Sequence, residues 1–543
     1  MRATTRAAVV AGLAGSVLVA SACGASVGGA STGKDTGGKA GGEITVQGCQ
    51  PQNTLLGGNT GEQCGHDIVT LTTSMLFRYD PETSQPKNDL AESVETTDNQ
   101  NFTVKIRQGV TFHDGSALTA KSFVDAWNYT AYAPNKQYLA SFMEPIEGYA
   151  ALQADKGTPT STAMTGLKVV DDHTFTIKTA EPVSNMPLRL GFTAFAPLPD
   201  SFFADPAEAA KKPIGAGPYQ LEEYTPNQRV VLKKFNDYGG AAEKGNVDQI
   251  TFRIYKDSGA AYNDLLANNL DVTVEIPAGS LIDKTYEQEL DGRFINGPFP
   301  AVQTIMMPPT SVAPEYAKPE LRKAISMAID RDKVTKDQFA GTRVPADGWV
   351  APGVEGFQAG ACGEDCRYDP AKAKAMLAKA GGFNGKLAIG YNADASHKSW
   401  VEATCNSIRQ ALDVDCIGAP TSDFAAFRDA IGKHELTYMF RSAWTADYPH
   451  IENFLTPQYS KGAASNDTEY DNPAFDAKLA AAAKATGADS LKLYQDAEKM
   501  LDVDMPSIPL WYYQVNIGYS TKVTNVQLNR TDGRADLLSI KTR

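Results

Sequence analysis

Residues 102–127 read FTVKIRQGVTFHDGSALTAKSFVDAW, and this stretch joins a strand signal to a helix signal. Apolar and polar side chains alternate over residues 102–107, which predicts a strand with one buried face. A second short strand is expected at residues 110–112. The pattern that follows Thr119 is helical, and a threonine hydroxyl at that position can cap the first turn of a helix. The stretch therefore predicts a mixed α/β protein.

Strand and helix signals alternate irregularly along the rest of the chain. Further strands are expected at residues 229–235, 250–255, 271–275 and 507–513. Further helices are expected at residues 260–268, from Pro319 along an apolar face that ends at Ile329, and from Asp369-Pro370 to Gly381-Gly382. With no internal repeat, this order favours an α/β protein with several lobes.

Composition limits the class of partner. The chain has 543 residues, of which 42% are hydrophobic and 21% are charged, so it can bury a large core in more than one lobe. Its formal net charge is −13, which argues against a nucleic-acid partner. Beyond the N-terminal segment no apolar stretch approaches about 18 residues, so no membrane-spanning helix is expected.

The N-terminal segment has the layout of an export signal. Arg2 and Arg6 precede an uncharged apolar stretch at residues 7–20, which ends in small residues just before Cys23. This resembles the signal of a bacterial lipoprotein, with residues 1–22 as the cleaved signal peptide and an acyl chain on the Cys23 thiol. An ordinary secretory signal with an incidental cysteine is the alternative.

Residues 23–42 are expected to form a flexible tether. The segment after Cys23 consists mostly of Gly, Ala, Ser, Thr and Lys and contains no aromatic residue. Such a segment buries too little apolar surface to fold by itself.

The sequence has seven cysteines, and six remain without Cys23. An even number of cysteines in an exported protein is typical of disulfides, although six cysteines allow many pairings. Proximity in the sequence suggests the pairs Cys49–Cys64, Cys362–Cys366 and Cys405–Cys416. A zinc site at Cys362 and Cys366 is the alternative, but no second pair with suitable spacing and no nearby histidine accompanies them, so no metal is expected.

No hydrolase motif supports a secreted enzyme. None of the six histidines belongs to a His-Glu-x-x-His zinc motif, and the nucleophile-elbow match at residues 24–28 lies in the tether. We interpret His113-Asp114 as part of a turn and not as a catalytic pair. We interpret the run that contains Gly215 and Gly217 as a tight turn and not as a phosphate loop.

Four segments occur in the order found in one family. They lie within residues 90–124, at Pro-Ile-Gly-Ala-Gly-Pro-Tyr (213–219) with Asn-Asp-Tyr (236–238) after it, at residues 319–334, and at Trp-Thr-Ala-Asp-Tyr-Pro (444–449). In this combination the chain resembles the oligopeptide- and dipeptide-binding proteins of ABC importers, which are solute-binding proteins of family 5, over residues 43–543.

The resemblance implies an α/β fold of the two-lobed periplasmic-binding-protein type (type II, cluster C), a clamp with an extra subdomain. The first lobe is expected to be discontinuous. The expected divisions are residues 43–80, 189–297 and 507–543 for lobe I, residues 81–188 for the extra subdomain, and residues 298–506 for lobe II.

The resemblance also implies ligand contacts near residue 447. The family holds the α-ammonium of a peptide with an aspartate that matches Asp447, because an ammonium buried without a fixed anion costs several kcal/mol. The backbone of residues 443–445 is expected to pair with the peptide as an added strand. The other expected contacts are Ala443 and Thr445 on that strand, Trp444 as a wall, and Tyr138 from the extra subdomain. Arg441 is expected to face a ligand carboxylate, or to pair with an acidic side chain in its absence. Trp349 and Trp511 are expected to pack in the core.

The implied function is peptide capture without catalysis. The protein would be a monomer without a cofactor, anchored through Cys23 on the outer face of the cell membrane and delivering peptides to ABC permease subunits. Tethering would raise its concentration near the permease. The open alternatives are an oligosaccharide, a metal chelate, an opine or haem as the ligand, and a receptor for a peptide signal.

Overall fold

The computed structural model describes residues 37–153 and 158–543. The expected signal peptide, Cys23 and the first part of the tether lie outside the described residues. Among the helices of the described residues, none is both long enough and apolar enough to cross a membrane.

The first sheet is assembled from segments far apart in the sequence. Its strands, in the order β1-β10-β9-β8, are Glu43–Gly48, Gln249–Ile254, Arg229–Lys234 and Tyr219–Thr225. β1 runs parallel to β10, whereas the other pairs are antiparallel. Val46, Leu232 and Ile250 are buried in its core, and the strands expected at 229–235 and 250–255 are confirmed.

The C-terminal segment completes this first core. Ile517, Val523 and Ile540 are buried with the residues of the first sheet. Two short antiparallel pairs hold the segment, β17 (Val523–Thr524) with β20 (Lys541–Thr542) and β18 (Leu528–Asn529) with β19 (Arg534–Ala535). The lobe built on this sheet is therefore discontinuous in sequence.

No strand forms at residues 271–275, where one was expected. Val272 makes single bridges to Val46 and to Tyr519, and the backbone N–H of Thr45 donates to Asp271 Oδ2 at 2.8 Å. Backbone hydrogen bonds join the segment to Thr45 and Gln47 on one side and to Gly518 and Ser520 on the other, but they form a single bridge to each neighbour and no longer ladder.

The second sheet belongs to the stretch expected as the extra subdomain. Its strands, in the order β4-β5-β7-β6, are Ala91–Glu95, Asn101–Ile106, Thr174–Lys178 and Leu167–Asp171. Phe102 and Val104 are buried while Thr103 and Lys105 are exposed, as the alternation predicted. Helix α2 (Ala120–Ala131) packs against this sheet.

The connection between β5 and α2 contains a turn instead of the second strand expected there. Residues 111 and 117 form a single bridge around Asp114-Gly115, and Gly115 has a φ of +83°. His113 packs in the turn, with Nε2 at 3.0 Å from the Gly217 carbonyl oxygen. Thr119 and Ser122 then cap α2 reciprocally, which confirms the expected helix start.

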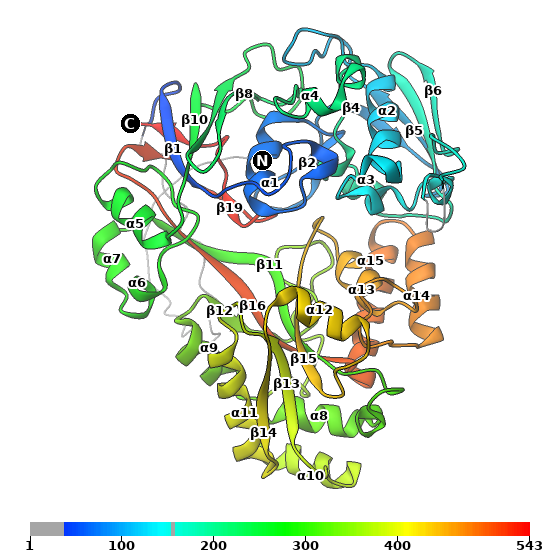
Figure 1. Ribbon diagram of the computed structural model, residues 1–543, viewed down its shortest axis with the longest axis vertical. Helices are drawn as coiled ribbons and strands as arrows, with labels where there is room; N and C mark the ends of the chain where they lie inside the picture. Colours follow the sequence, from blue (N-terminus) through cyan, green and yellow to red (C-terminus); the bar gives the residue numbers. More distant parts are fainter. Residues whose placement is uncertain (1–36, 154–157) are drawn as a thin grey trace, which may run out of the picture. The chain divides into compact units, whose positions relative to one another are not determined.

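The third sheet carries the largest core. Its strands, in the order β12-β16-β11-β15-β13-β14, are Arg343–Pro345, Ser507–Gly518, Phe294–Met306, Met439–Thr445, Leu387–Asn392 and Cys416–Thr421. Eight helices accompany it, and Figure 1 shows α8, α10 and α11 beside β13 and β14. They are α8 (Pro319–Met327), α9 (Arg331–Phe339), α10 (Pro370–Ala380), α11 (Lys398–Leu412), α12 (Phe424–Gly432), α13 (Glu452–Tyr459), α14 (Pro473–Lys484) and α15 (Gly487–Asp504).

The two expected helices of this region are confirmed. Pro319 opens α8, and the side chains of its apolar face are buried. The side chain of Asp369 accepts a hydrogen bond from the Lys372 N–H at 2.9 Å at the start of α10, and Gly381 ends that helix with a φ of +94°.

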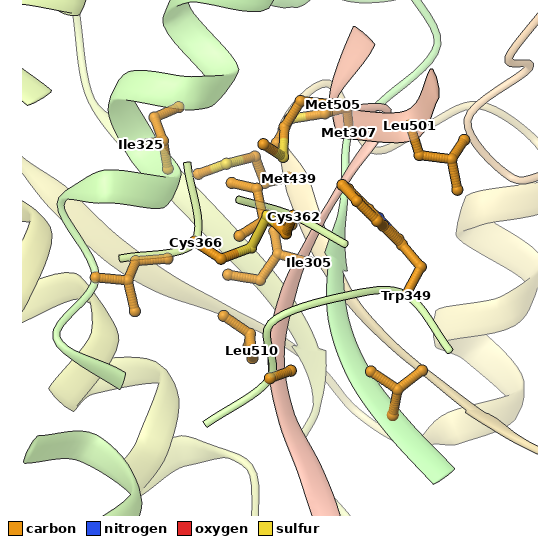
Figure 2. Packing of buried hydrophobic residues seen from close by; sticks show 14 of the residues in the cluster. Ile305, Met307, Ile325, Trp349, Cys362, Cys366, Met439, Leu501, Met505 and Leu510 are labelled. Carbon is orange, nitrogen blue, oxygen red and sulfur yellow. A yellow bond between two sulfur atoms is a disulfide. The ribbon is translucent and has the colours of Figure 1, made fainter. Parts of the chain in front are cut away.

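The core of the third sheet is drawn from many segments. Figure 2 shows Trp349 and Met439 in one cluster with Cys362 and Cys366, beside Ile305 of β11. The indole N–H of Trp349 donates to Ser507 Oγ at 3.0 Å, so its polar atom is satisfied within the core. Trp349 and Trp511 are both 1% exposed, which confirms their expected core role.

β11 and β16 belong to two cores at once. These long antiparallel strands lie side by side in Figure 1. Ile295 and Ile517 lie in the first core, whereas Ile305 and Ile508 lie in the core of the third sheet. A 13-residue strand extends about 40 Å, enough to serve both cores.

Packing does not follow the expected domain divisions at two places. The division before residue 507 separates β16 from the core of the third sheet, where its first half is buried. The division before residue 189 separates Phe192 and Phe195 from the core of the second sheet, to which they belong. A domain boundary that is inferred from the order of sequence motifs cannot show which core a strand or short helix packs against.

The remaining elements are short. They are α1 (Gln63–Thr72), β2 (Phe77–Tyr79), β3 (Pro86–Asn88), α3 (Met186–Arg189), α4 (Pro206–Ala209), α5 (Ser258–Leu266), α6 (Ala278–Ile282) and α7 (Thr285–Leu290). α5 confirms the helix expected at residues 260–268. The tight turn at 213–219 passes the end of α1 so closely that a Cβ on Gly215 would lie 1.9 Å from the Thr72 carbonyl oxygen.

The last residues of the expected tether are hydrogen-bonded to the first lobe. Lys39 N–H donates to the Thr542 carbonyl at 2.7 Å, and Gly41 N–H donates to the Asn246 carbonyl at 2.7 Å. Residues 39–42 are thus fixed to the first lobe, although the tether was expected to reach residue 42. Backbone hydrogen bonds hold them, and these need no apolar side chains.

The six cysteines outside the signal lie in the three pairs suggested by proximity. The sulfur atoms are 1.94 Å apart in Cys49–Cys64, 1.96 Å in Cys362–Cys366 and 2.06 Å in Cys405–Cys416, which are bonding distances. This arrangement supports disulfides over the zinc alternative.

Replacing both Cys49 and Cys64 by alanine is expected to lower the free energy of unfolding by about 3 kcal/mol, because their link closes a loop in the unfolded chain. Urea denaturation of the two proteins measures the difference. Alkylation of these cysteines in unreduced, denatured wild-type protein, read by mass spectrometry, would show that the bond is absent.

Candidate ligand-binding site

A cavity of about 950 Å³ is lined by segments from both lobes. The first lobe and the region of the second sheet contribute the start of α1, the β2–β3 hairpin, residues 191–193, residues 241–246 and the C-terminal segment. Lobe II contributes Phe299 of β11, Thr445 at the end of β15, and the two residues that follow it. Small-molecule sites typically measure about 300–1,000 Å³, so the volume is that of a ligand site.

Asp447 is held rigidly at the cavity by one asparagine. Its backbone N–H donates to Asn453 Oδ1 at 3.0 Å, and Asn453 Nδ2 donates to Asp447 Oδ2 at 3.0 Å. Asn453 belongs to α13, so the helix fixes the carboxylate that follows β15. This hydrogen bond occupies one carboxylate oxygen and leaves the other for a ligand.

Burial raises the pKa of the Asp447 carboxyl, and the hydrogen bond from Asn453 and the positive charge of Arg189 oppose the rise. Arg189 does not neutralise Asp447 directly, because its guanidinium pairs with Glu452 at 3.0 Å. Within residues 37–153 and 158–543, Asp447 forms no ion pair within 4.0 Å. The site therefore holds a desolvated carboxylate that a cation would stabilise.

β15 presents an open edge next to Asp447. β11 pairs with β15 along residues 440–445, whereas β13 on the other side pairs only with Met439 and Phe440. Ala443 and Thr445 are exposed on this stretch. The backbone from Arg441 onward can therefore pair with an additional strand on the β13 side.

The expected contact residues do not all line the cavity. Thr445 and Asp447 do, whereas Ala443 lies on the neighbouring strand edge. The Trp444 indole N–H donates to Asn453 Oδ1 at 3.1 Å, so Trp444 supports the asparagine that holds Asp447.

Arg441 and Tyr138 lie outside the cavity lining. Arg441 Nε donates to Asn392 Oδ1 at 2.8 Å, and its guanidinium stacks 5.3 Å from the ring centre of Phe424. Among the described residues Arg441 therefore contacts an amide and not an acidic side chain, and its contact with a ligand carboxylate stays a prediction. The Tyr138 side chain is 68% exposed, its backbone N–H donates to Asn59 Oδ1 at 3.1 Å, and its ring lies beside Gly61, which does line the cavity.

Sequence reasoning missed His66 and Asp532. His66 Nε2 lies 3.5 Å from Asp532 Oδ1 at the cavity, where α1 meets the C-terminal segment. Burial opposes protonation of His66, but Asp532 outweighs it and raises the pKa of the imidazole. The two residues are 466 positions apart, so no local motif could have revealed the pair.

Thr193 and Tyr79 also line the cavity. Thr193 is 1% exposed, and its Oγ1 has no hydrogen-bond partner among the described residues. Such an atom is stabilised when a ligand supplies the missing partner. Tyr79 donates its hydroxyl to the Leu188 carbonyl at 2.6 Å, so its ring is fixed as part of the wall.

No metal cluster accompanies these residues. Within the two described ranges, no group of three or more His, Cys, Asp or Glu side chains is arranged to hold a metal ion. The cavity is lined by carboxylates, one histidine, lysine and arginine side chains and aromatic rings.

Comparisons with known proteins agree with this architecture. The family model of the bacterial extracellular solute-binding proteins, family 5, matches residues 85–466. The chain is 26% identical to the periplasmic oligopeptide-binding protein of Escherichia coli K12 over 441 residues, 79% of each chain. It is 25% identical to the oligopeptide-binding protein of Bacillus subtilis 168 over 518 residues, 91% of this chain and 92% of the other.

A solved structure shares the fold. The clavulanic acid biosynthesis oligopeptide binding protein 2 superposes with a TM-score of 0.83 at 19% identity, over 95% of this chain and 99% of that one. The α/β fold is thus the two-lobed periplasmic-binding-protein clamp. Because its model covers more than half of the sequence, the chain belongs to the bacterial extracellular solute-binding proteins of family 5.

Proposed function

We propose that this protein captures peptides with a free N-terminus in the 950 Å³ cavity and delivers them to an ABC importer. The observation that carries the proposal is the Asp447 carboxylate, fixed by Asn453 and without a cationic partner within 4.0 Å in the described part of the chain. A peptide α-ammonium supplies that partner. A charge-assisted hydrogen bond of this kind contributes about 1.5–3 kcal/mol.

The open edge of β15 supports a peptide over other solutes. A peptide backbone that lies beside residues 441–445 gains main-chain hydrogen bonds without any requirement on its side chains. An oligosaccharide has neither an ammonium for Asp447 nor a backbone that pairs with a strand. The names of the Escherichia coli and Bacillus subtilis relatives, both oligopeptide-binding proteins, point the same way.

Delivery from the outer face of the membrane completes the proposal. The acyl chain proposed on Cys23 and the residues up to about Lys39 would tether the folded protein to the membrane, within reach of the permease. A short flexible tether keeps the effective concentration of the binding protein high. The same capture step would also serve a receptor that senses peptides.

Calorimetric titration tests the proposal. Protein freed of bound ligand by unfolding and refolding is titrated with trialanine and with N-acetyl-trialanine. We expect trialanine to bind roughly tenfold to a hundredfold more tightly, because acetylation removes the ammonium. Equal affinity for the two peptides would contradict the role of Asp447, and binding of neither peptide, together with a sugar or chelate in mass spectra of the co-purified ligand, would exclude a peptide ligand.

A further inference from the structure

The cavity contains more negative than positive side chains. Six carboxylates line it, against four lysine and arginine side chains. Some carboxylates are already compensated: Asp80 pairs with Lys87 at 2.5 Å, and Asp532 faces His66 at 3.5 Å. One of the four cations, Arg78, is engaged at 2.9 Å by Asp89, which does not line the cavity. The excess of negative charge is therefore concentrated on the remaining acids.

Asp536 is one of four carboxylates that line the cavity and form no ion pair among the described residues, the others being Asp447, Glu62 and Glu243. Its Oδ1 accepts the Leu538 N–H at 3.2 Å, and within the described residues it forms no ion pair within 4.0 Å. Burial raises its pKa to about 6, and the negative charges of Glu243 and Asp532 contribute to the rise. An ionised Asp536 is thus costly in the empty cavity, as is an ionised Asp447.

The surroundings of Asp536 suit a long basic side chain. Leu538 lies next to it in the cavity lining and offers apolar surface to a methylene stem. A smaller pocket also reaches Asp536, but its volume is about 100 Å³ against about 950 Å³ for the main cavity, which leaves less room for a long basic side chain. The main cavity is therefore where Asp536 can meet a positive charge.

Thr193 gives independent evidence that this cavity is built for a polar ligand. Its buried Oγ1 lacks a hydrogen-bond partner in the described part of the chain, although the residue is 1% exposed. A ligand amide or carbonyl in the cavity can satisfy this hydroxyl.

We infer that the cavity selects peptides with a second positive charge, a lysine or arginine side chain, and that Asp536 receives this charge while Asp447 receives the α-ammonium. The inference rests on the proposed function, because it assigns Asp447 to the N-terminus. It names the substrate class: cationic peptides.

Matched peptides separate this inference from the proposed function. Trialanine variants with lysine at position 1, 2 or 3 are titrated by calorimetry beside the same peptides with Nε-acetyl-lysine, which keeps the stem and removes the charge. We expect lysine to bind at least tenfold more tightly than acetyl-lysine in one or more positions. If acetyl-lysine binds as tightly as lysine at every position, the charge preference is wrong although peptide capture stands; if no peptide of either series binds, the proposed function itself fails.

Variants of Asp536 test the assigned residue. Asp536→Asn is expected to abolish the lysine preference while acetyl-lysine peptides keep their affinity, which also shows that the variant is folded. Asp536→Glu keeps the charge and is expected to retain most of the preference. Glu435→Gln makes the same change in net charge at an exposed position outside the cavity lining and should leave the preference unchanged. A full lysine preference in Asp536→Asn would overturn the assignment.

Discussion

Asp447→Asn is expected to weaken the binding of a peptide with a free N-terminus by about 2–5 kcal/mol, since the substitution leaves a buried ammonium without its anion. Asparagine has almost the same shape as aspartate and can still accept the hydrogen bond from Asn453, so the loop after β15 should keep its position. The measurement is calorimetric titration of trialanine against wild-type and variant protein.

N-acetyl-trialanine provides the control for this prediction. Because this peptide lacks the ammonium, it should bind the wild type and Asp447→Asn with similar, low affinity. The substitution in the protein and the acetylation of the peptide together define a double-mutant cycle. Glu435→Gln, an equal change in charge at an exposed position of lobe II, should not alter affinity. If Asp447→Asn binds trialanine as well as the wild type does, the carboxylate does not hold the N-terminus.

The raised pKa of Asp447 predicts that both stability and peptide affinity depend on pH. Because burial raises the pKa of Asp447 in the ligand-free protein, its ionised form costs stability, and this cost appears as pH rises through the raised pKa. Peptide binding requires the ionised form, so affinity should fall on acidification through that same pKa, at a higher pH than for an ordinary aspartate. Titrations of Asp447→Asn over the same pH range should lack this component.

Arg189→Met is expected to lower the free energy of unfolding by about 3–5 kcal/mol, the second large effect. Arg189 pairs at 3.0 Å with Glu452, whose side chain is 6% exposed and also accepts from Asn185 at 3.0 Å and from the Tyr448 hydroxyl. Removing the guanidinium leaves a buried carboxylate without a counter-charge. The resulting loss of stability is larger than the net stabilisation that the intact ion pair contributes. Urea denaturation at pH 7 measures the loss.

The double variant Arg189→Met/Glu452→Gln provides the matched control. With both charges gone, the loss should be smaller than the sum of the two single losses, because no isolated charge stays buried. A double variant that loses the full sum would show that the two charges do not interact.

The ionisation of Glu452 also makes the free energy of unfolding depend on pH, with a sign that follows from its pKa. Although burial opposes it, Arg189 lowers the pKa of the Glu452 carboxyl in the folded protein. The pair therefore contributes stability above the unfolded pKa of a glutamate, and that contribution is lost as pH falls through the lowered folded pKa. Arg189→Met should lack this acid-dependent loss.

Local sequence signals located elements well where a short pattern suffices. The alternation at 102–107, the capping residue Thr119, and the Asp369 to Gly381 helix limits all appear in the structure as expected. The strand expected at 271–275 did not form, because a strand needs a neighbour along its whole length and Val272 meets its neighbours at single points. Local propensity does not carry that information.

The residues of the candidate site also divide into those that local sequence can suggest and those that only folding brings together. Asp447 could be proposed from the residues around it because they match a family motif. Asp532 and Asp536 could not, since they reach the cavity from the C-terminal segment and meet His66 of α1 and Glu243 only after folding. Where no ligand carboxylate is present, Arg441 was expected to pair with an acidic side chain, and it instead contacts Asn392 at the end of β13, a partner that sheet pairing decides.

By itself, the sequence determined the α/β class and the proximity pairs of cysteines, and it predicted the export signal and a ligand contact at Asp447, because each depends on residues that are close together in the chain. Only the tertiary structure decided which cores β16 joins, where the described chain first contacts the first lobe and which carboxylates share one cavity. These depend on contacts between segments hundreds of residues apart, and such contacts are fixed by packing and desolvation of the folded chain.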